Sequence, residues 1–371
     1  MTSTRTRFIL SGLAVALTGS GLAFTTQPAP ENTDGGSSSE FQFTIEMLDQ
    51  LPSLPGELGA LPASVDNPNN PTTPEKVELG NMLFFDTRLS RDHSMSCATC
   101  HDPNKGWADG RPLAQGFGGK VLGRHSPTVL NAAFNSAQFW DGRAPDLEAQ
   151  AIGPIMATGE MNSASEAEVI ERLSASKDYR DRFQKVFGSA PTLADVGKAI
   201  AAFERTVIST DSRFDAYCKG DKKALTDSEK RGLILFFGKA SCTQCHSGPN
   251  FSDNKYHNLG GHGSTPTEDL GRYGISKDEK DRGAFKTATC RSVDLTGPYM
   301  HDGRLATLEE VVDYYNAGGG SDPKKSELMQ PLNLTASEKT DLVAFLKSLT
   351  GSVPGIQVLT AVDDAPANEP E

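Results

Sequence analysis

The chain contains the stretch Cys97-Ala98-Thr99-Cys100-His101, and a second stretch of the same form follows at Cys242-Thr243-Gln244-Cys245-His246. In such a stretch the two thiols can form thioether bonds to the vinyl groups of one haem, while the adjacent histidine supplies a proximal ligand to its iron. A Cys-x-x-Cys pair also occurs as half of a zinc site or as a redox dithiol. Because the five-residue pattern occurs twice, the sequence predicts two covalently attached c-type haems with His101 and His246 as iron ligands.

The first residues have the composition of a secretory signal. Arg5 and Arg7 precede an apolar run from Phe8 to Phe24, and small residues suitable for cleavage follow. We expect residues 1–26 to be removed and the chain to be exported to the periplasm, where haem c attachment and disulfide formation both occur. The run is too short and glycine-rich for a membrane anchor, and no other segment is expected to span a membrane.

The net charge of the chain is -12. Nucleic acid and anionic lipid surfaces repel a protein of this charge, so neither is expected as a partner. A basic electron-donor protein is compatible with it. The residues leave the oligomeric state open, a homodimer included.

Two of the six cysteines remain once four are assigned to haem. Cys218 and Cys290 both lie in the second half of the chain. In an exported protein two such thiols often pair as a disulfide, and two separate buried apolar cysteines are an equal alternative.

Composition divides the chain into segments. Residues 27–40 are rich in Pro, Gly, Ser and acidic residues, and residues 352–371 are polar and acidic with few large side chains. We expect the first to be a disordered linker and the second a disordered tail, both outside the core. Between them we place two haem domains, at residues 41–210 and 211–351.

An internal repeat relates these two predicted domains. Residues 80–85, Gly-Asn-Met-Leu-Phe-Phe, precede the first haem stretch, and residues 232–237, Gly-Leu-Ile-Leu-Phe-Phe, precede the second. The Asp-Gly-Arg motif of residues 141–143 recurs at residues 302–304. Matches at equal spacing predict the duplication of one haem-binding unit.

The rest of the pattern is helical. Capping residues and apolar residues at 3.6-residue spacing mark four segments: 165–174, 192–208, 307–316 and 335–349. Helices that begin near Thr73 and Thr226 are also expected before the haem stretches. No segment alternates convincingly as a strand does. We therefore predict a mostly α fold of two cytochrome c-like haem domains with long loops.

The two halves differ at the position that could supply a sixth ligand to each haem iron. Tyr315 follows His301 by 14 residues, and the repeat aligns His301 with Trp140 and Tyr315 with Pro154. A phenolate can bind iron, whereas a proline cannot. The second haem is therefore expected to have a sixth ligand and the first to be open to a substrate. The alternative for Tyr315 is a buried tyrosine that packs on the porphyrin edge.

Taken together, the motifs resemble those of the bacterial dihaem cytochrome c peroxidases and MauG. The resemblance covers about residues 79–351 and rests on the two haem stretches and on four further motifs: Leu83-Phe84-Phe85-Asp86-x-Arg88-Leu89-Ser90, Phe139-Trp140-Asp141-Gly142-Arg143, Thr296-Gly297-Pro298-Tyr299-Met300-His301-Asp302-Gly303 and Asp341-Leu342-Val343-Ala344-Phe345-Leu346. It implies that the first haem reacts with peroxide and that the second passes electrons. It also implies that Trp140 lies between them as a relay.

The resemblance assigns roles to residues over the first haem. The family's distal glutamine and glutamate match Gln150 and Glu160, and its distal-side proline matches Pro154. Cleavage of the O–O bond needs a proton to move from the near oxygen of peroxide to the leaving one. We therefore expect Glu160 to act as the acid/base group and Gln150 to orient the peroxide. On sequence alone either residue would be interpreted as a solvated helix residue.

Around the second haem the sequence follows MauG in one respect and departs from it in another. The position of Tyr315 is a methionine in typical peroxidases and a tyrosine in MauG, and a tyrosinate ligand favours higher oxidation states. The surface tryptophan of MauG is matched by Ala240, which argues against synthesis of a tryptophan-derived quinone in a partner. His301 is expected to hydrogen-bond a haem propionate, with iron ligation as the alternative.

Two further departures concern the first haem and a calcium site. Typical peroxidases have a histidine in the loop after the first stretch, but residues 116–119 contain Phe117 and glycines, so the first haem is expected to be open as isolated. The family binds calcium through backbone carbonyls that match Thr296 and Pro298. A calcium ion is expected there from the resemblance, although His125 stands where an asparagine is usual.

The function expected from this resemblance is that of a periplasmic dihaem c-type peroxidase. It would reduce hydrogen peroxide with electrons from a small redox protein, such as a cytochrome c or a cupredoxin, or from an oxidisable protein partner. One alternative is a non-catalytic dihaem electron-transfer cytochrome, in which both irons would be six-coordinate. The other is a MauG-like enzyme that oxidatively modifies a dedicated protein substrate.

Overall fold

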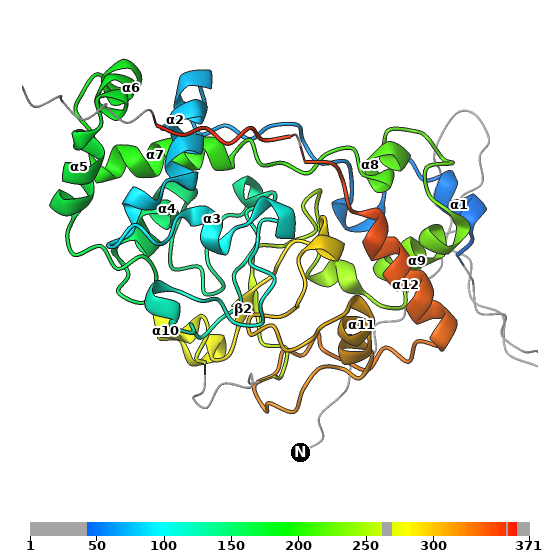
Figure 1. Ribbon diagram of the computed structural model, residues 1–371. Coiled ribbons are helices and arrows are strands. Elements are labelled where there is room, and N and C mark those ends of the chain that lie inside the picture. The colour runs from blue at the N-terminus through cyan, green and yellow to red at the C-terminus, as the bar shows by residue number, and fades with distance from the viewer. Residues whose placement is uncertain (1–42, 262–268, 354, 362–371) are drawn as a thin grey trace, which may run out of the picture. The chain divides into compact units, whose positions relative to one another are not determined.

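A computed structural model describes residues 43–261, 269–353 and 355–361 (Figure 1). The predicted signal, linker and residues 362–371 of the predicted tail lie outside the described residues. The described chain is mostly helical, as predicted, with long connections between its helices. Its named strands are β1 (Tyr256–His257) and β2 (Phe285–Lys286), which form one antiparallel pair. No helix among the described residues is long and apolar enough to cross a membrane.

The helices between residues 74 and 204 pack around one hydrophobic core. Within it α2 lies against α7, which also lies against α4. Gly80 allows this close approach, because a Cβ at this position would collide with the carbonyl oxygen of Ala199 on α7. The core helices are α2 (Pro74–Phe85), α3 (Cys97–Cys100), α4 (Leu147–Met156), α5 (Glu166–Ala175), α6 (Lys177–Phe187) and α7 (Leu193–Glu204).

A second core repeats this packing with other helices. Here α9 lies against α12, and Gly232 on α9 allows the contact because a Cβ would collide with the carbonyl oxygen of Asp341 on α12. Gly80 and Gly232 are the first residues of the repeat seen in the sequence, so the repeated glycine has the same steric function in both halves. The helices of this core are α1 (Ile45–Asp49), α8 (Arg213–Cys218), α9 (Asp227–Phe237), α11 (Leu308–Asn316) and α12 (Ala336–Ser348). The short helix α10 (Tyr273–Ser276) contributes no residue to either core.

The predicted helix starts are confirmed by their caps. The side chains of Thr73, Ser165, Thr192, Thr226, Thr307 and Thr335 each accept a hydrogen bond from a main-chain N–H in the first helical turn. One predicted end is wrong, since α7 ends at Glu204 rather than at residue 208. The chain leaves the helix there because Val207 O accepts from the N–H of Asn131, in a loop of the same half.

Residues 352, 353 and 355–361 differ from the predicted disordered tail, because they pack on the first core. After α12 this segment, red in Figure 1, runs back to α2. There the buried side chain of Asn81 donates to Gln357 O at 3.0 Å and accepts from Leu359 N at 2.9 Å. The apolar side chains of the segment pack against the first core: Val353, Ile356, Leu359 and Ala361.

A buried ion pair joins two parts of the second half to the segment that precedes the first core. Arg291 is 1% exposed, and its guanidinium donates to Asp215 Oδ1 on α8 at 2.7 Å. It also donates to Pro249 O at 2.9 Å and to Gly59 O at 2.6 Å. The guanidinium therefore fixes α8, the loop that follows the second haem stretch, and the segment before the first core.

Replacing Asp215 by Asn is expected to destabilise the protein by about 2 kcal/mol, because the buried guanidinium loses its counter-charge but keeps a hydrogen-bond acceptor. Denaturant unfolding followed by far-UV circular dichroism measures the change. Asp211→Asn is the matched control, since Asp211 and its partner Lys219 are exposed and their ion pair contributes little. An equal effect of the two substitutions would contradict the prediction.

Candidate functional site

A cavity of about 550 Å³ lies beside the first Cys-x-x-Cys-His stretch. Its wall contains both cysteines and His101. It also contains Gln150 and Pro154 from α4, Glu160 from the turn after α4, and Trp140. The structure therefore brings together around one space all the residues that the sequence assigned to the first site.

A smaller cavity of about 220 Å³ lies beside the second stretch. Cys242, Cys245 and His246 line it, and so do Tyr315 from α11 and His301. Trp140 lines both cavities.

Main-chain carbonyls orient the histidines of both stretches. Nδ1 of His101 lies 3.3 Å from Trp107 O, and Nδ1 of His246 lies 3.1 Å from Phe251 O. A carbonyl can only accept, so each Nδ1 carries the proton and each Nε2 keeps the lone pair that a metal ligand requires. Burial lowers the pKa of both rings, which keeps them neutral and available to a metal.

Of the two adjacent tyrosines on α11, Tyr315 lines the second cavity. The Tyr314 hydroxyl donates to Leu259 O at 2.9 Å. Burial raises the pKa of the Tyr315 phenol, so this group stays protonated unless a nearby cation compensates the phenolate charge. A ferric iron is such a cation.

Glu160 is a half-buried carboxyl in the wall of the first cavity. Burial raises its pKa above the ordinary value, and the charge of Arg143 partly opposes this shift. A loop that sequence reasoning did not assign to the site holds this residue, since Phe117 N donates to Glu160 O at 2.8 Å. Gly116 approaches Gly159 so closely that any side chain would collide with its carbonyl oxygen. The run of glycines around Phe117 is the signal that could have identified this loop.

Trp140 is fixed between the cavities by main-chain contacts. Its indole Nε1 donates to His125 O at 2.9 Å, and its carbonyl accepts from Lys286 N at 2.8 Å. The His301 ring lies 6.5 Å from the Trp140 ring and stacks on Phe285, with 3.7 Å between ring centroids. Burial lowers the pKa of His301 to about 4, so its imidazole is neutral.

Comparisons with known proteins identify the family. A family profile described as Di-haem cytochrome c peroxidase matches residues 74–223. Cytochrome-c peroxidase IdrP1 of Pseudomonas sp. (strain SCT) is 43% identical over 312 residues, which cover 76% of this chain and 82% of that protein. Methylamine utilization protein MauG of Methylorubrum extorquens is 46% identical over 281 residues, covering 75% and 78%. The chain belongs to the dihaem cytochrome c peroxidase and MauG family.

Solved structures agree with this assignment. A crystal structure of a MauG-like protein associated with microbial copper homeostasis has a TM-score of 0.73 and 35% identity, and the match covers 79% of this chain and 94% of that one. The diheme peroxidase BthA of Burkholderia thailandensis has a TM-score of 0.65 at 23% identity and shows the same fold. The match covers 84% of this chain and 99% of that one. As a member of the family, the chain is a peroxidase-type oxidoreductase with two haem c groups.

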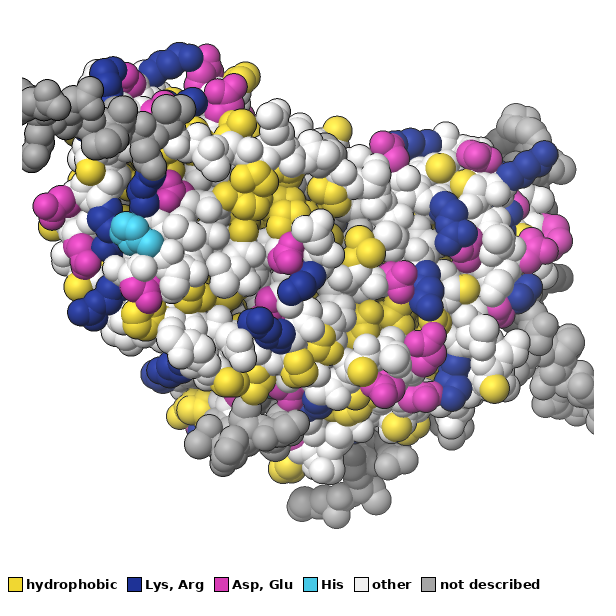
Figure 2. All heavy atoms as spheres, in the orientation of Figure 1, with side chains coloured by type: hydrophobic (Ala, Val, Ile, Leu, Met, Phe, Trp, Pro, Cys, Tyr) yellow, Lys and Arg dark blue, Asp and Glu magenta, His cyan; other side chains and the backbone are white. Residues whose placement is uncertain are grey.

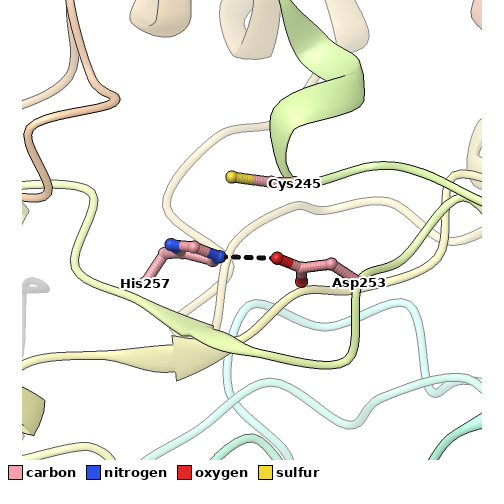
Figure 3. A group of neighbouring side chains, drawn as sticks. All are labelled: Cys245, Asp253 and His257. Atoms are coloured by element: carbon pink, nitrogen blue, oxygen red, sulfur yellow. Dashed lines mark hydrogen bonds and ion pairs between the residues drawn. The ribbon is translucent and has the colours of Figure 1, made fainter. Parts of the chain in front are cut away.

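The residues present fit two haems of the c type. Each cavity contains two cysteine sulfurs for thioether bonds and one neutral histidine whose Nε2 is free to bind iron. The zinc alternative fits less well. Cys245, Asp253 and His257 form a cluster of potential metal ligands among the described residues (Figure 3). Haem attachment uses the Cys245 sulfur, and the remaining pair, joined at 2.9 Å, is smaller than the ligand set of a structural zinc site.

The two remaining cysteines are unpaired in the structure. Cys290 is buried, and its sulfur lies 3.2 Å from Nδ1 of His246. This cysteine therefore packs behind the second proximal histidine, and the alternative of two separate cysteines describes the structure better than a disulfide with Cys218 does.

The predicted calcium site involves a departure from the family pattern. His125 is buried, and its Nδ1 bonds to Arg111 O at 2.7 Å. An imidazole held in this way cannot supply the amide oxygen that an asparagine would offer to a hard cation. The carbonyls of Thr296 and Pro298 are separated by a cis peptide bond between Gly297 and Pro298. Calcium binding at these carbonyls stays a prediction.

Proposed function

We propose that this chain is an exported dihaem peroxidase that reduces hydrogen peroxide to two water molecules, with two electrons from a small redox protein and two protons. The main support is the first cavity, where Gln150, Pro154 and the half-buried Glu160 share one space with His101. The bound haem would supply the iron that receives peroxide and the electrons that reduce it. The chain's own residues control the proton and the space for the substrate.

Glu160 is the proposed acid/base group. As a carboxylate it would accept the proton of the peroxide oxygen nearer the iron, and as a carboxylic acid it would return that proton to the leaving oxygen. Burial raises the pKa of this carboxyl above the ordinary glutamate value, which makes its acid form a better match for proton return than that of a solvated glutamate. The amide of Gln150 would hold the peroxide by hydrogen bonding, and Pro154 has no side-chain group that could bind the iron.

Trp140 is the proposed path between the two haems. It lines both cavities, and hydrogen bonds at its indole and its carbonyl fix its ring. Electrons from a donor protein would enter at the second haem and reach the first through this indole. Figure 2 shows positive and negative side chains interspersed on the face drawn, with hydrophobic side chains gathered toward its middle. A donor that docks by apolar contact rather than by one sign of charge fits this face.

The ferric protein is expected to contain one high-spin and one low-spin haem. Pro154 would leave the first iron open, and Tyr315 would close the second. Electron paramagnetic resonance of the purified protein separates the two signals. Two low-spin signals would instead indicate an electron-transfer cytochrome without a substrate site, and would contradict the proposed peroxidase.

A MauG-like activity on a dedicated protein is the second candidate. Tyr315 in the second cavity favours it, because an anionic ligand stabilises oxidised iron. Ala240 counts against it, since this residue is 5% exposed and offers no aromatic ring at the surface. Oxidation of a partner in this class would be seen as a change in the partner's mass after peroxide is added.

We infer that the two halves arose by duplication of one haem-binding unit. Matching contacts support this inference. The Thr128 hydroxyl donates to Gly106 O at 2.6 Å, and the equivalent Thr289 hydroxyl donates to Asn250 O at 2.7 Å. The main-chain bonds between the halves are also reciprocal, since residue 125 donates to residue 301 and residue 286 donates to residue 140.

A further inference from the structure

Lys286 lies where the two cavities meet, and its residue lines both of them. It belongs to β2 in the second half, and its main-chain N–H donates to the carbonyl of Trp140 in the first half at 2.8 Å. The position is therefore fixed relative to the proposed relay residue.

The side chain of Lys286 has no paired carboxylate among the described residues. Lys286 is 8% exposed, and its Nζ makes one long hydrogen bond of 3.4 Å, to the carbonyl of Thr287. Among the described residues no carboxylate forms an ion pair with it. Asp253 is the acidic group that contributes to its field, and the carboxylate of Asp253 already bonds His257 and the Thr287 hydroxyl. Burying an ammonium in this way is costly unless an anion pairs with it.

Neighbouring basic groups at the junction are already satisfied. Arg124 lines the first cavity, but its guanidinium binds Asp269 and Asp141 at 2.7 Å each. His125 occupies the position that the repeat aligns with Lys286, and its ring bonds to Arg111 O. Lys286 is thus the member of this group whose charged atom lacks a strong partner in the protein.

A haem propionate would supply such an anion. Each haem c has two propionate carboxylates, and the protein is a member of a family that binds two haems. Burial lowers the pKa of Lys286 to about 8, which still leaves the ammonium largely charged at neutral pH and able to pair with a carboxylate.

We propose that Lys286 binds a haem propionate at the junction of the two cavities and, as a positioning residue, holds that haem against Trp140. Its positive charge then favours the reduced form of the haem whose propionate it binds. The proposal depends on the two haems and not on peroxidase activity, so it stands or fails separately from the proposed function.

Reduction potentials of both haems test this proposal. Lys286→Met removes the charge, Lys286→Arg keeps it, and Lys255→Met removes an exposed lysine from the neighbouring segment as a control. A spectroelectrochemical titration of each haem-loaded variant gives both potentials. We expect Lys286→Met to lower the reduction potential of the haem that loses its partner. The ratio of the two singly reduced forms, with the electron on one haem or on the other, should change by about tenfold or more. The Arg and Lys255 variants should keep the parental potentials.

Comparing the potential shifts of the two haems also identifies the haem whose propionate Lys286 binds. A larger downward shift at the first haem assigns the propionate to that group, and a larger shift at the second assigns it to the other. If Lys286→Met fails to take up both haems, Lys286→Gln replaces it, since the amide fits a similar space and can donate to the Thr287 carbonyl. Failure of both neutral variants to bind one haem that the Arg variant binds would support the pairing. Parental potentials in a loaded neutral variant, or an equal shift in the Arg variant, would overturn it.

Discussion

Replacing Glu160 by Gln is expected to slow the reaction with hydrogen peroxide by about 10² or more while both haems stay bound. The amide has nearly the same shape, so the cavity and the contact between Phe117 N and Glu160 O should survive. It cannot accept and return a proton, however. Stopped-flow absorbance at the haem bands under excess peroxide measures the rate.

Glu166→Gln is the matched control for this prediction. Glu166 lies in the first turn of α5 on the surface, away from the residues that line the cavity. Its variant should react at the parental rate. A parental rate in Glu160→Gln would remove Glu160 from the mechanism.

The pH dependence supplies a second readout for the same carboxyl. Burial raises the pKa of Glu160, and the first step needs its deprotonated form. The rate should therefore rise with pH through a pKa above the ordinary glutamate value and level off beyond it. Glu160→Gln should lose this dependence. A pH limb that persists in the variant would belong to another group.

Replacing Tyr315 by Met is expected to convert the second haem from histidine and tyrosinate ligation to histidine and methionine ligation. The thioether is neutral and favours reduced iron, so the reduction potential of the second haem should rise. Electron paramagnetic resonance and a potentiometric titration measure the two changes. The first haem should keep its high-spin signal.

Tyr314→Phe is the control for the second haem. It removes a hydroxyl that donates to Leu259 O, from a residue outside the cavity lining. Its spectrum and potentials should match those of the parent. If Tyr315→Met also leaves the low-spin signal and potential unchanged, Tyr315 only packs beside the haem, and His301 becomes the next candidate ligand.

The Tyr315→Met variant separates the two candidate activities, donor-dependent reduction of peroxide and oxidation of a protein partner. A Tyr315→Met protein that reduces peroxide faster when a donor protein is supplied would behave as a donor-dependent peroxidase. Loss of partner oxidation in the same variant would show that the MauG-like activity requires the Tyr315 tyrosinate.

The sequence predicted the features that depend on neighbouring residues. Caps such as Thr192 and Thr335 are local hydrogen bonds, and a Cys-x-x-Cys-His stretch contains all its own ligands. The Thr307 cap and the apolar spacing after it also placed Tyr315 correctly on a helix, and the structure adds that it lines the second cavity. The roles of Glu160 and Gln150 came from resemblance alone, because a single carboxyl or amide on a helix has no distinctive pattern.

Features that depend on distant parts of the chain were not predicted. Lys286 is unremarkable in sequence and becomes significant because β2 carries it to Trp140, which lies 146 positions earlier. The support of Glu160 by Phe117 is also long-range. The end of α7 shifted for the same reason, since the loop at Asn131 competes for the main chain beyond Glu204.

The segment of residues 355–361 has a consequence for the order in which the protein folds. Asn81 is synthesised early, but its buried amide bonds to residues 357 and 359. Until residues 355–361 dock, that face of α2 stays in contact with water, so the first core is completed only by a segment that follows the whole second half in sequence. Such a contact of high sequence separation forms slowly. The first core therefore reaches its full stability only once residues 355–361 have packed against α2.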